Sequence, residues 1–280
     1  MYIDKYNMKR KTILITGTSS GVGKSTTKLF QAQGWNVIAT MRTPEKESEL
    51  SQLENTFVTR LDVIDEASIS SAILQGINRF GKIDVLLNNA GYGSLGPLEA
   101  FDIESIKKQF ETNVFGLLAV TKAIIPHFRS IHNGTLINIS SMGCRVTLPL
   151  GSVYHGTKYA VEGISEALFY ELETIGVKVK IVEPGAIKTN FLGDAFDIRN
   201  DESINEYQNI IQRFFTASSF MEKASTPEDV AQVIWNAATD GSNTLRYIAG
   251  SDALEFLSLY DKISDNEFFD IMKSEFGIEV

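Results

Sequence analysis

Cysteine and histidine are scarce in this chain. Cys144 is the one cysteine, and the three histidines, His127, His132 and His155, are scattered along the sequence. An intrachain disulfide is therefore excluded, and no group of these residues has the spacing of a zinc site. We expect no metal site and a reducing compartment. A lone thiol is more often a packed apolar group than a nucleophile, so Cys144 is expected to be structural.

Basic residues are also in deficit. Lys and Arg number 26 against 35 Asp and Glu, which gives a formal net charge of −9. This balance argues against a general surface for nucleic acid or anionic membrane. Residues 1–11 lack an apolar signal segment, and no run reaches the ~18 apolar residues of a membrane span. We expect a cytoplasmic protein without a nucleic-acid or membrane partner. The net charge does not exclude an anionic cofactor, because backbone N–H groups at a helix N-terminus can hold phosphate locally.

Short apolar, β-branched runs alternate with longer amphipathic segments. The runs expected to form strands are residues 12–16, 37–40, 57–61, 83–87, 135–139 and 177–182, with a seventh at 245–249. Such near-continuous apolar runs indicate a parallel sheet with helices on both faces. Right-handed crossovers then predict an α/β, doubly wound Rossmann fold of about seven strands. No linker divides the chain, so we expect a single domain over residues 1–280.

The longest helical patterns cover residues 103–129 and 152–175. Thr-Pro-Glu-Asp at 226–229 is typical of a helix start, with a capping hydroxyl and a proline in the first turn. Residues 190–225 form a long, phenylalanine-rich segment, which we expect to act as a substrate loop or lid. Apolar spacing near the end predicts a C-terminal amphipathic helix over about 253–276.

Three polar residues form a candidate catalytic set. Ser141 lies 13 residues before Tyr154, and Lys158 follows that tyrosine by four residues. Residues four apart share a helix face, so we expect the lysine cation to lower the phenol pKa from about 10 towards neutrality. Such a phenol can exchange a proton with an alcohol oxygen, to which Ser141 would add a hydrogen bond. By itself Tyr-x-x-x-Lys is common, and a surface pair is the simpler interpretation.

A glycine-rich loop, T-G-T-S-S-G-V-G, occupies residues 16–23. Its glycines allow a tight turn and a close backbone approach to a pyrophosphate at a helix N-terminus. Gly23, Lys24 and Ser25 also resemble the end of a Walker A loop, although the strict pattern needs glycine where Thr18 stands. A stretched version looks like the phosphate loop of dethiobiotin synthetases, so an ATP-dependent enzyme is a rival interpretation. In the dinucleotide interpretation Lys24 is a solvated helix residue.

The ordered set of motifs resembles the short-chain dehydrogenase/reductase family. The resemblance is carried by residues 16–23, Asp62, residues 88–91, Asn113, Ser141, Tyr154, Lys158 and residues 184–189. It covers about residues 10–190 strongly and the remainder loosely. It implies hydride transfer between a nicotinamide cofactor and a carbonyl or alcohol, and a homodimer or homotetramer in which the two long helices pack between subunits. A non-catalytic dinucleotide-binding regulator is the other alternative.

The resemblance also assigns cofactor residues. They are Gly17, Ser19, Ser20, Gly21, Val22, Gly23, Asp62, Val63, Asn89, Ala90, Gly91, Tyr154, Lys158, Pro184, Gly185, Ile187 and Thr189. Asn88 is expected to bridge strands. Many NAD-binding relatives place an acid at the end of the second strand, where this chain has Met41 followed by Arg42. A guanidinium suits a 2′-phosphate, so Arg42 favours NADP(H) over NAD(H), with a solvated arginine as the alternative.

The resemblance implies a mechanism. NADPH would give hydride to the carbonyl carbon while Tyr154 supplies the proton and Ser141 binds the oxygen. Lys158 would also bind the nicotinamide ribose, and Asn113 would hold a water between that lysine and solvent, or mark a helix kink, or both. Candidate substrate-lining residues are 92–95, 143–150, Phe191, Phe196, Phe214, Phe215 and Phe220. Their aromatic character favours an apolar or aromatic small-molecule substrate.

Overall fold

A computed structural model describes residues 10–188, 196–216 and 223–278, and the structural statements below concern these ranges. Seven parallel strands form one sheet in the order β3-β2-β1-β4-β6-β7-β9. They are β1 (Thr12–Thr16), β2 (Asn36–Met41), β3 (Thr56–Arg60), β4 (Val85–Asn88), β6 (Gly134–Ile139), β7 (Val177–Pro184) and β9 (Arg246–Ala249). The strand order reverses direction between β1 and β4, which is the switch point where doubly wound sheets bind ligands. The predicted doubly wound fold is confirmed.

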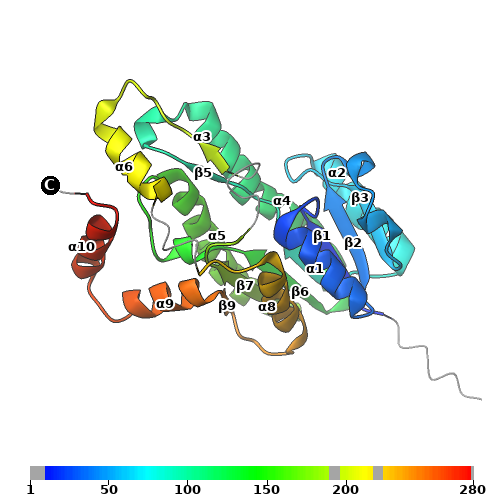
Figure 1. The fold of residues 1–280 in the computed structure, drawn as a ribbon. Coiled ribbons are helices and arrows are strands. Elements are labelled where there is room, and N and C mark those ends of the chain that lie inside the picture. The colour runs from blue at the N-terminus through cyan, green and yellow to red at the C-terminus, as the bar shows by residue number, and fades with distance from the viewer. Residues whose placement is uncertain (1–9, 189–195, 217–222, 279–280) are drawn as a thin grey trace, which may run out of the picture.

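Helices cover both faces of this sheet (Figure 1). They are α1 (Gly21–Ala32), α2 (Glu66–Phe80), α3 (Ile103–Phe110), α4 (Leu117–Ile131), α5 (Ser152–Glu173), α6 (Asn205–Thr216), α8 (Pro227–Thr239), α9 (Ser251–Tyr260) and α10 (Asp265–Glu275). In β1, Ile13 and Ile15 pack with α1 and α8, whereas Leu14 packs with α2 and α4 on the opposite face. Because both faces of each central strand are buried, most of their side chains are apolar.

The predicted helix over 103–129 is interrupted. A π-helical turn at Glu111–Gly116 separates α3 from α4. The continuous run Ile103–Ile131 has the length and apolar composition of a membrane span, contrary to the expectation from sequence. In this fold, however, Val120, Ile124 and Phe128 are buried against the sheet. Its apolar composition therefore has an explanation in core packing.

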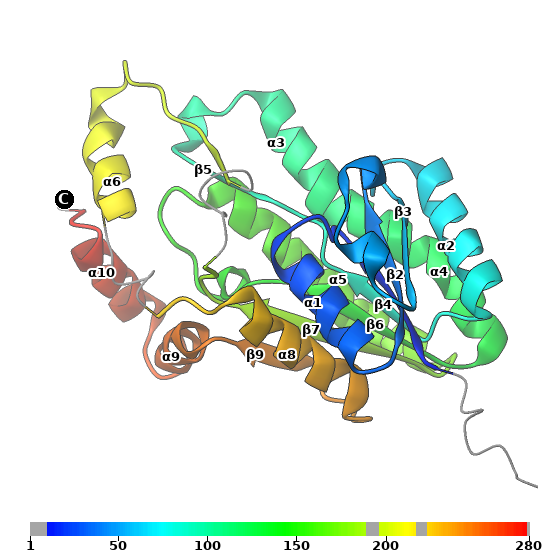
Figure 2. The ribbon, with the colours of Figure 1, turned by 45° about the vertical axis from the view of Figure 1, so that its right-hand side comes forward.

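The region after β7 differs most from expectation. Residues 190–225 were predicted as a long loop, but they contain strand β8 (Phe196–Ile198), which pairs with β5 (Gly93–Leu95), and helix α6. The single predicted C-terminal helix is two helices, since Ser264 and Glu267 form a capping box that starts α10. Figure 2 shows α6, α9 and α10 gathered at one end of the molecule. The helix start predicted at Thr226 is confirmed by its own capping box with Asp229.

Candidate active site

The glycine-rich loop lies between β1 and α1 and packs tightly on neighbouring backbone. Gly17 has φ +72°, and a Cβ there would lie 2.9 Å from the Cα of Ala90. A Cβ on Gly23 would collide with the Gly17 carbonyl oxygen and lie 2.6 Å from the Asn89 amide nitrogen. Ser20, at the N-cap of α1, makes no side-chain capping bond, and the first turn has no acid. The loop therefore presents free N–H groups and a positive helix end, which suit an anion.

Two polar side chains hold this loop in place. The Thr16 hydroxyl oxygen accepts hydrogen bonds from the N–H groups of Asn89 and Ala90, each at 3.0 Å. The Asn89 amide nitrogen donates to the carbonyl oxygens of Thr16 (2.9 Å) and Gly17 (3.0 Å). The Asn89 side chain, assigned to the cofactor by the family resemblance, thus shapes the loop itself. Its neighbour Asn88 bridges strands as predicted and donates to Asn138 at 3.0 Å.

The lysine and serine of the Walker-like sequence are directed away from the loop. Lys24 forms an ion pair with Glu49 at 2.8 Å, and its Nζ is 3.6 Å from a Glu47 oxygen. The hydrogen bond with Glu49 raises the pKa of Lys24, so the prediction of a merely solvated lysine is wrong. Ser25 donates a 2.8 Å hydrogen bond to Glu228 on α8. Both side chains are therefore engaged by carboxylates of the protein, which disfavours the ATP-binding interpretation.

The adenosine side of the predicted site lies where β2 and β3 end. Met41 is buried, and Arg42 is exposed with no hydrogen bond or ion pair to any described residue. Asp62 is half-buried, and its carboxylate accepts a hydrogen bond from the Ile64 N–H at 3.3 Å. Val63 is buried against the π-helical turn, where a Cβ on Gly116 would lie 2.6 Å from it. The Arg42 guanidinium is thus available to an incoming anion.

Ser141, Tyr154 and Lys158 come together at the carboxyl end of β6. Lys158 lies with its Nζ 5.8 Å from the centre of the Tyr154 ring and donates to the Ile139 carbonyl at 2.9 Å. Ser141, which lies two residues after Ile139, accepts a 3.0 Å hydrogen bond from the Gly143 N–H. The structure therefore assembles the three residues that the sequence motif separates.

Burial decides the protonation of this group. It raises the pKa of the Tyr154 phenol above its usual 10, against the opposing effect of a hydrogen bond with Ser141. It lowers the pKa of Lys158 from 10.5 to about 8. The expected lowering of the phenol pKa is therefore wrong for this structure, because desolvation is the largest effect on the phenol. The Lys158 ammonium is itself bonded to the Ile139 carbonyl. A protonated phenol is the form that can donate a proton.

Asn113 is buried in the π-helical turn Glu111–Gly116. Its Oδ1 accepts from the Tyr92 N–H at 3.1 Å, and its Nδ2 donates to the Tyr92 carbonyl at 2.8 Å and to the Thr157 hydroxyl at 3.1 Å. Both ends of the amide are thus bonded to the protein, and the helix is distorted at this residue into a π-helical turn. The predicted kink itself stays a prediction. Such π turns are frequent at functional sites. The predicted water next to Asn113 stays a prediction.

Known proteins share both the sequence and the fold of this chain. A family model described as short chain dehydrogenase matches residues 11–200. The protein belongs to the short-chain dehydrogenase/reductase family. An uncharacterized oxidoreductase of Schizosaccharomyces pombe is 46% identical over 243 residues, which cover 85% of this chain and all of that protein. A short-chain dehydrogenase structure from Streptomyces avermitilis has a TM-score of 0.81 at 31% identity and covers 98% of this chain and 100% of its own. The structure of ElxO with NADP bound has a TM-score of 0.74 at 29% identity and covers 88% and 99%.

Family membership makes the protein an oxidoreductase that binds a dinucleotide. The family motif predicts that the nicotinamide binds beside the segment after β7. Gly185 donates to the Ala249 carbonyl at 3.0 Å, and Ala186 donates to the Asp252 carboxylate at 2.6 Å. A Cβ on Gly185 would collide with that carboxylate. Ile187 pairs with Ser225, and Thr189 lies outside the described residues. The motif did not predict Asp252, which lies at the start of α9 and is buried.

A buried acidic group lies close to Lys158. Cys144, Glu162 and Glu183 have ligand atoms within 4.8 Å of one another, which is a grouping that could hold a metal ion. Arg246 already contacts both acids, at 3.0 Å from Glu162 and 3.2 Å from Glu183. Burial raises the pKa of the Cys144 thiol, as expected for a structural cysteine. The guanidinium supplies the positive charge that these carboxylates need.

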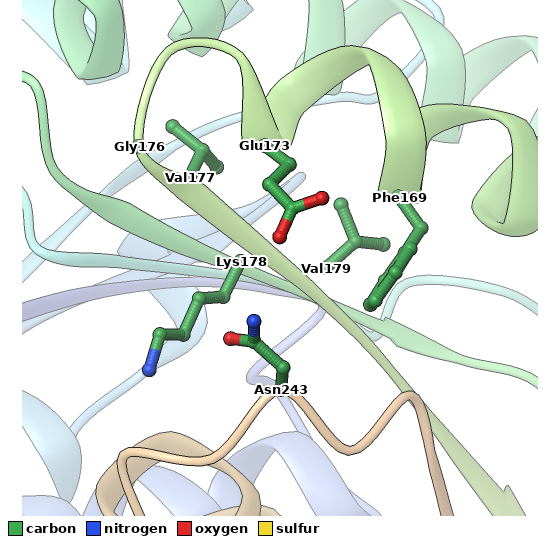
Figure 3. Close-up of a pocket in the computed structure, with 7 residues that line it drawn as sticks. All are labelled: Phe169, Glu173, Gly176, Val177, Lys178, Val179 and Asn243. Carbon is green, nitrogen blue, oxygen red and sulfur yellow. The ribbon is translucent and has the colours of Figure 1, made fainter.

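The substrate side of the site is only partly described. Phe214, one of the five predicted lining phenylalanines, stacks on Phe276 with ring centres 5.5 Å apart. The other four fall outside what the structure describes: Phe191 and Phe220 as residues, and Phe196 and Phe215 as side chains. A hollow lined by Phe169, Glu173, Lys178 and Asn243 lies beside the amino end of β7 (Figure 3). It is at the opposite edge of the sheet from the candidate catalytic residues.

Proposed function

We propose that this protein uses NADPH to reduce an apolar or aromatic carbonyl compound, and that the same site supports the reverse oxidation of the alcohol. The observation that carries the proposal is the meeting of Ser141, Tyr154 and Lys158 at the carboxyl edge of the sheet. This edge also holds the glycine loop after β1. Hydride donor and carbonyl would therefore lie between them.

The residues present fit a dinucleotide. Gly17 and Gly23 leave no room for a Cβ, so the loop can fold tightly against Ala90 and Asn89. This packing supports a loop backbone held in place beside the N-terminus of α1, where a pyrophosphate would bind. The N-terminus of α1 offers donors without an acid to repel phosphate. The free guanidinium of Arg42 supports a 2′-phosphate at the end of β2, and ElxO binds NADP. These features support NADPH as the cofactor.

The bound nicotinamide would supply the hydride, and the side chains would supply the proton. Tyr154, held protonated by burial, donates its proton to the carbonyl oxygen. Ser141 accepts the Gly143 N–H, so its own O–H, which bonds to Tyr154 in this structure, can be donated to the same carbonyl oxygen in the reaction. Lys158, whose pKa of about 8 keeps it mostly charged at neutral pH, stabilises the phenolate that remains.

An apolar substrate is supported by the residues that follow Ser141. Met142 and Val146 are buried in a cluster with Leu257 of α9 and with Phe268 and Met272 of α10. The segment that leaves the catalytic serine is therefore backed by apolar side chains. A substrate bound against this segment would have apolar surroundings, which favours apolar groups on the substrate.

The experiment combines binding and turnover. Purified protein is titrated with NADPH and NADH by fluorescence, with ATP as competitor, and then assayed on aromatic and aliphatic ketones and aldehydes. In Tyr154→Phe we expect NADPH affinity within about twofold of the wild type and reduction slower by about 10²–10⁴-fold, the usual contribution of a general acid.

Tyr170→Phe is the matched control. Tyr170 lies on α5 like Tyr154, but it is exposed, and its ring contacts Phe169, which lines the hollow at the opposite edge of the sheet. This variant should keep wild-type rates. Reduction by Tyr154→Phe at the wild-type rate would refute the assignment of the proton donor, and binding of ATP without either nicotinamide cofactor would refute the proposed function itself.

A further inference from the structure

His155 follows Tyr154 on α5, and its ring is 6% exposed. The sequence favoured simple helix packing for this residue. Instead, both ring nitrogens are bonded to the loop that follows Ser141. Nδ1 lies 2.7 Å from the Gly143 carbonyl oxygen, and Nε2 lies 3.0 Å from the Leu148 backbone nitrogen.

These two bonds fix the protonation of the ring. The Leu148 N–H can only donate, so Nε2 is the unprotonated acceptor. Nδ1 therefore carries the hydrogen and donates it to the Gly143 carbonyl. Burial lowers the pKa of His155 below its usual 6.5, which keeps this neutral form at neutral pH.

The loop backbone is fitted closely around the ring. A Cβ on Gly143 would lie 2.6 Å from Nδ1, and a Cβ on Gly151 would lie 2.5 Å from Nε2. The Gly151 carbonyl also accepts the backbone N–H of His155 at 2.8 Å. Glycine at these two positions therefore allows the peptide groups themselves to reach the imidazole.

One of the two bonds leads directly to the catalytic serine. Gly143, whose carbonyl accepts from His155, donates its own N–H to the Ser141 hydroxyl oxygen at 3.0 Å. Moving Gly143 would therefore move the donor that orients Ser141. The other bond holds Leu148, which packs against the apolar cluster of α9 and α10.

We propose that His155 is a positioning residue with two separable roles in the proposed reaction. Its Nδ1–H, through Gly143, orients the Ser141 hydroxyl for the transition state. Its Nε2, through Leu148, holds the loop at 143–150 in the conformation that receives the substrate. This inference rests on the proposed function for its kinetic consequences, but not for its structural ones.

A pair of substitutions separates the two roles. In His155→Asn the amide nitrogen takes the place of Nδ1, and in His155→Gln the amide oxygen takes the place of Nε2. We expect His155→Asn to keep kcat within about threefold but to raise the carbonyl KM about tenfold, or about 1.4 kcal/mol, since one hydrogen bond is lost from the substrate loop. We expect His155→Gln to keep KM and to lower kcat about tenfold.

Hydrogen exchange measures the same bonds without a substrate. Segments 142–146 and 147–151 are followed by mass spectrometry in the wild type and both variants. His155→Asn should speed exchange mainly in 147–151, and His155→Gln mainly in 142–146. The KM for NADPH should be unchanged in both, which separates the effect from a general loss of structure.

Two results would overturn the proposal. One is the same fall in kcat and the same rise in the carbonyl KM in both variants. The other is a hydrogen-exchange rate in both segments that cannot be distinguished from the wild type. If the wild type reduces no carbonyl in the panel, the proposed function fails, and the exchange pattern still decides whether His155 holds the loop.

Discussion

The two halves of the sheet's carboxyl edge are built in different ways. In the half formed by β1, β2 and β4, the glycines meet backbone, as where Gly17 meets Ala90, although Thr16 and Asn89 also bond to the loop. In the half formed by β6, β7 and β9, buried polar side chains hold the loops, as where His155 bonds Leu148 and Asp252 bonds Ala186. The first half would hold the adenosine and pyrophosphate of a dinucleotide, and the second the nicotinamide and substrate.

This difference explains which half a sequence motif can predict. Close backbone contact excludes every side chain, so glycine spacing itself becomes the signal. A buried aspartate or histidine has no such signature, because the same residue type is usually found at the surface. Function that varies between relatives is therefore expected where the loops depend on individual side chains.

Gly23→Ala should have the largest effect on the backbone-built half. Its Cβ would collide with the Gly17 carbonyl oxygen, so the loop must shift away from the position that suits a pyrophosphate. We expect NADPH affinity to fall about 100-fold, in line with an overpacking cost of about 1–3 kcal/mol. Fluorescence titration measures this loss.

Gly163→Ala is the control for a generic glycine effect. This glycine lies in α5, and a Cβ there would meet no described heavy atom within 4 Å. Alanine favours a helix interior by roughly 0.5–1 kcal/mol, so thermal unfolding should move slightly upward while NADPH affinity is kept. Equal affinities in the Gly23 and Gly163 variants would contradict the backbone-built site.

Asp252→Ala tests the side-chain-built half. It removes the acceptor of the Ala186 N–H, and an unsatisfied buried N–H costs about 1–3 kcal/mol. We expect the KM for NADPH to rise about tenfold and the free energy of unfolding to fall by a similar ~1–3 kcal/mol. Steady-state kinetics and urea unfolding measure the two effects.

Asp252→Asn supplies the matched comparison, since its amide oxygen can still accept from Ala186. We expect its KM for NADPH to stay within about threefold of the wild type. If Asp252→Asn were as impaired as Asp252→Ala, the negative charge and not the hydrogen bond would be the important property. If neither variant changed KM, the loop after β7 would not depend on α9.

Strand positions were predictable because both faces of the sheet are buried. Ile13 and Ile15 pack in the core on one face of the sheet, and Leu14 packs in the core on the other face. A strand buried on both faces needs consecutive apolar residues, which are visible in the sequence as an apolar run. Two caps were also visible: Thr226 was recognised, whereas the capping box of Ser264 was missed although its Ser-x-x-Glu pattern is local.

The remaining differences arise from contacts between distant segments. The π-helical turn is bonded through Asn113 to Tyr92, 21 residues away, and β8 pairs with β5 across more than 100 residues. Nothing local encodes either contact. The direction of the Tyr154 pKa also depends on burial, which the Tyr-x-x-x-Lys spacing does not contain.

Arg42→Ala should have the smallest effect of the three changes. It tests an exposed side chain at the end of β2, in the half of the site that is otherwise built from backbone. Arg42 is exposed and makes no hydrogen bond or ion pair with a described residue, so we expect its removal to leave the free energy of unfolding unchanged. We expect NADPH affinity to fall about fivefold, or ~1 kcal/mol for a screened contact with a 2′-phosphate. NADH affinity should be unchanged, because that ribose carries no phosphate.

Lys46→Ala removes the same charge from the same connection between β2 and β3, where Lys46 is exposed at the end of a short 3₁₀ turn. It should leave both affinities unchanged if Arg42 acts through a local contact. Equal losses in the two variants would instead indicate a general electrostatic effect on a chain whose net charge of −9 repels the cofactor. The ratio of NADPH to NADH affinity, measured in rising salt, distinguishes these cases, since a long-range effect disappears as the Debye length shortens.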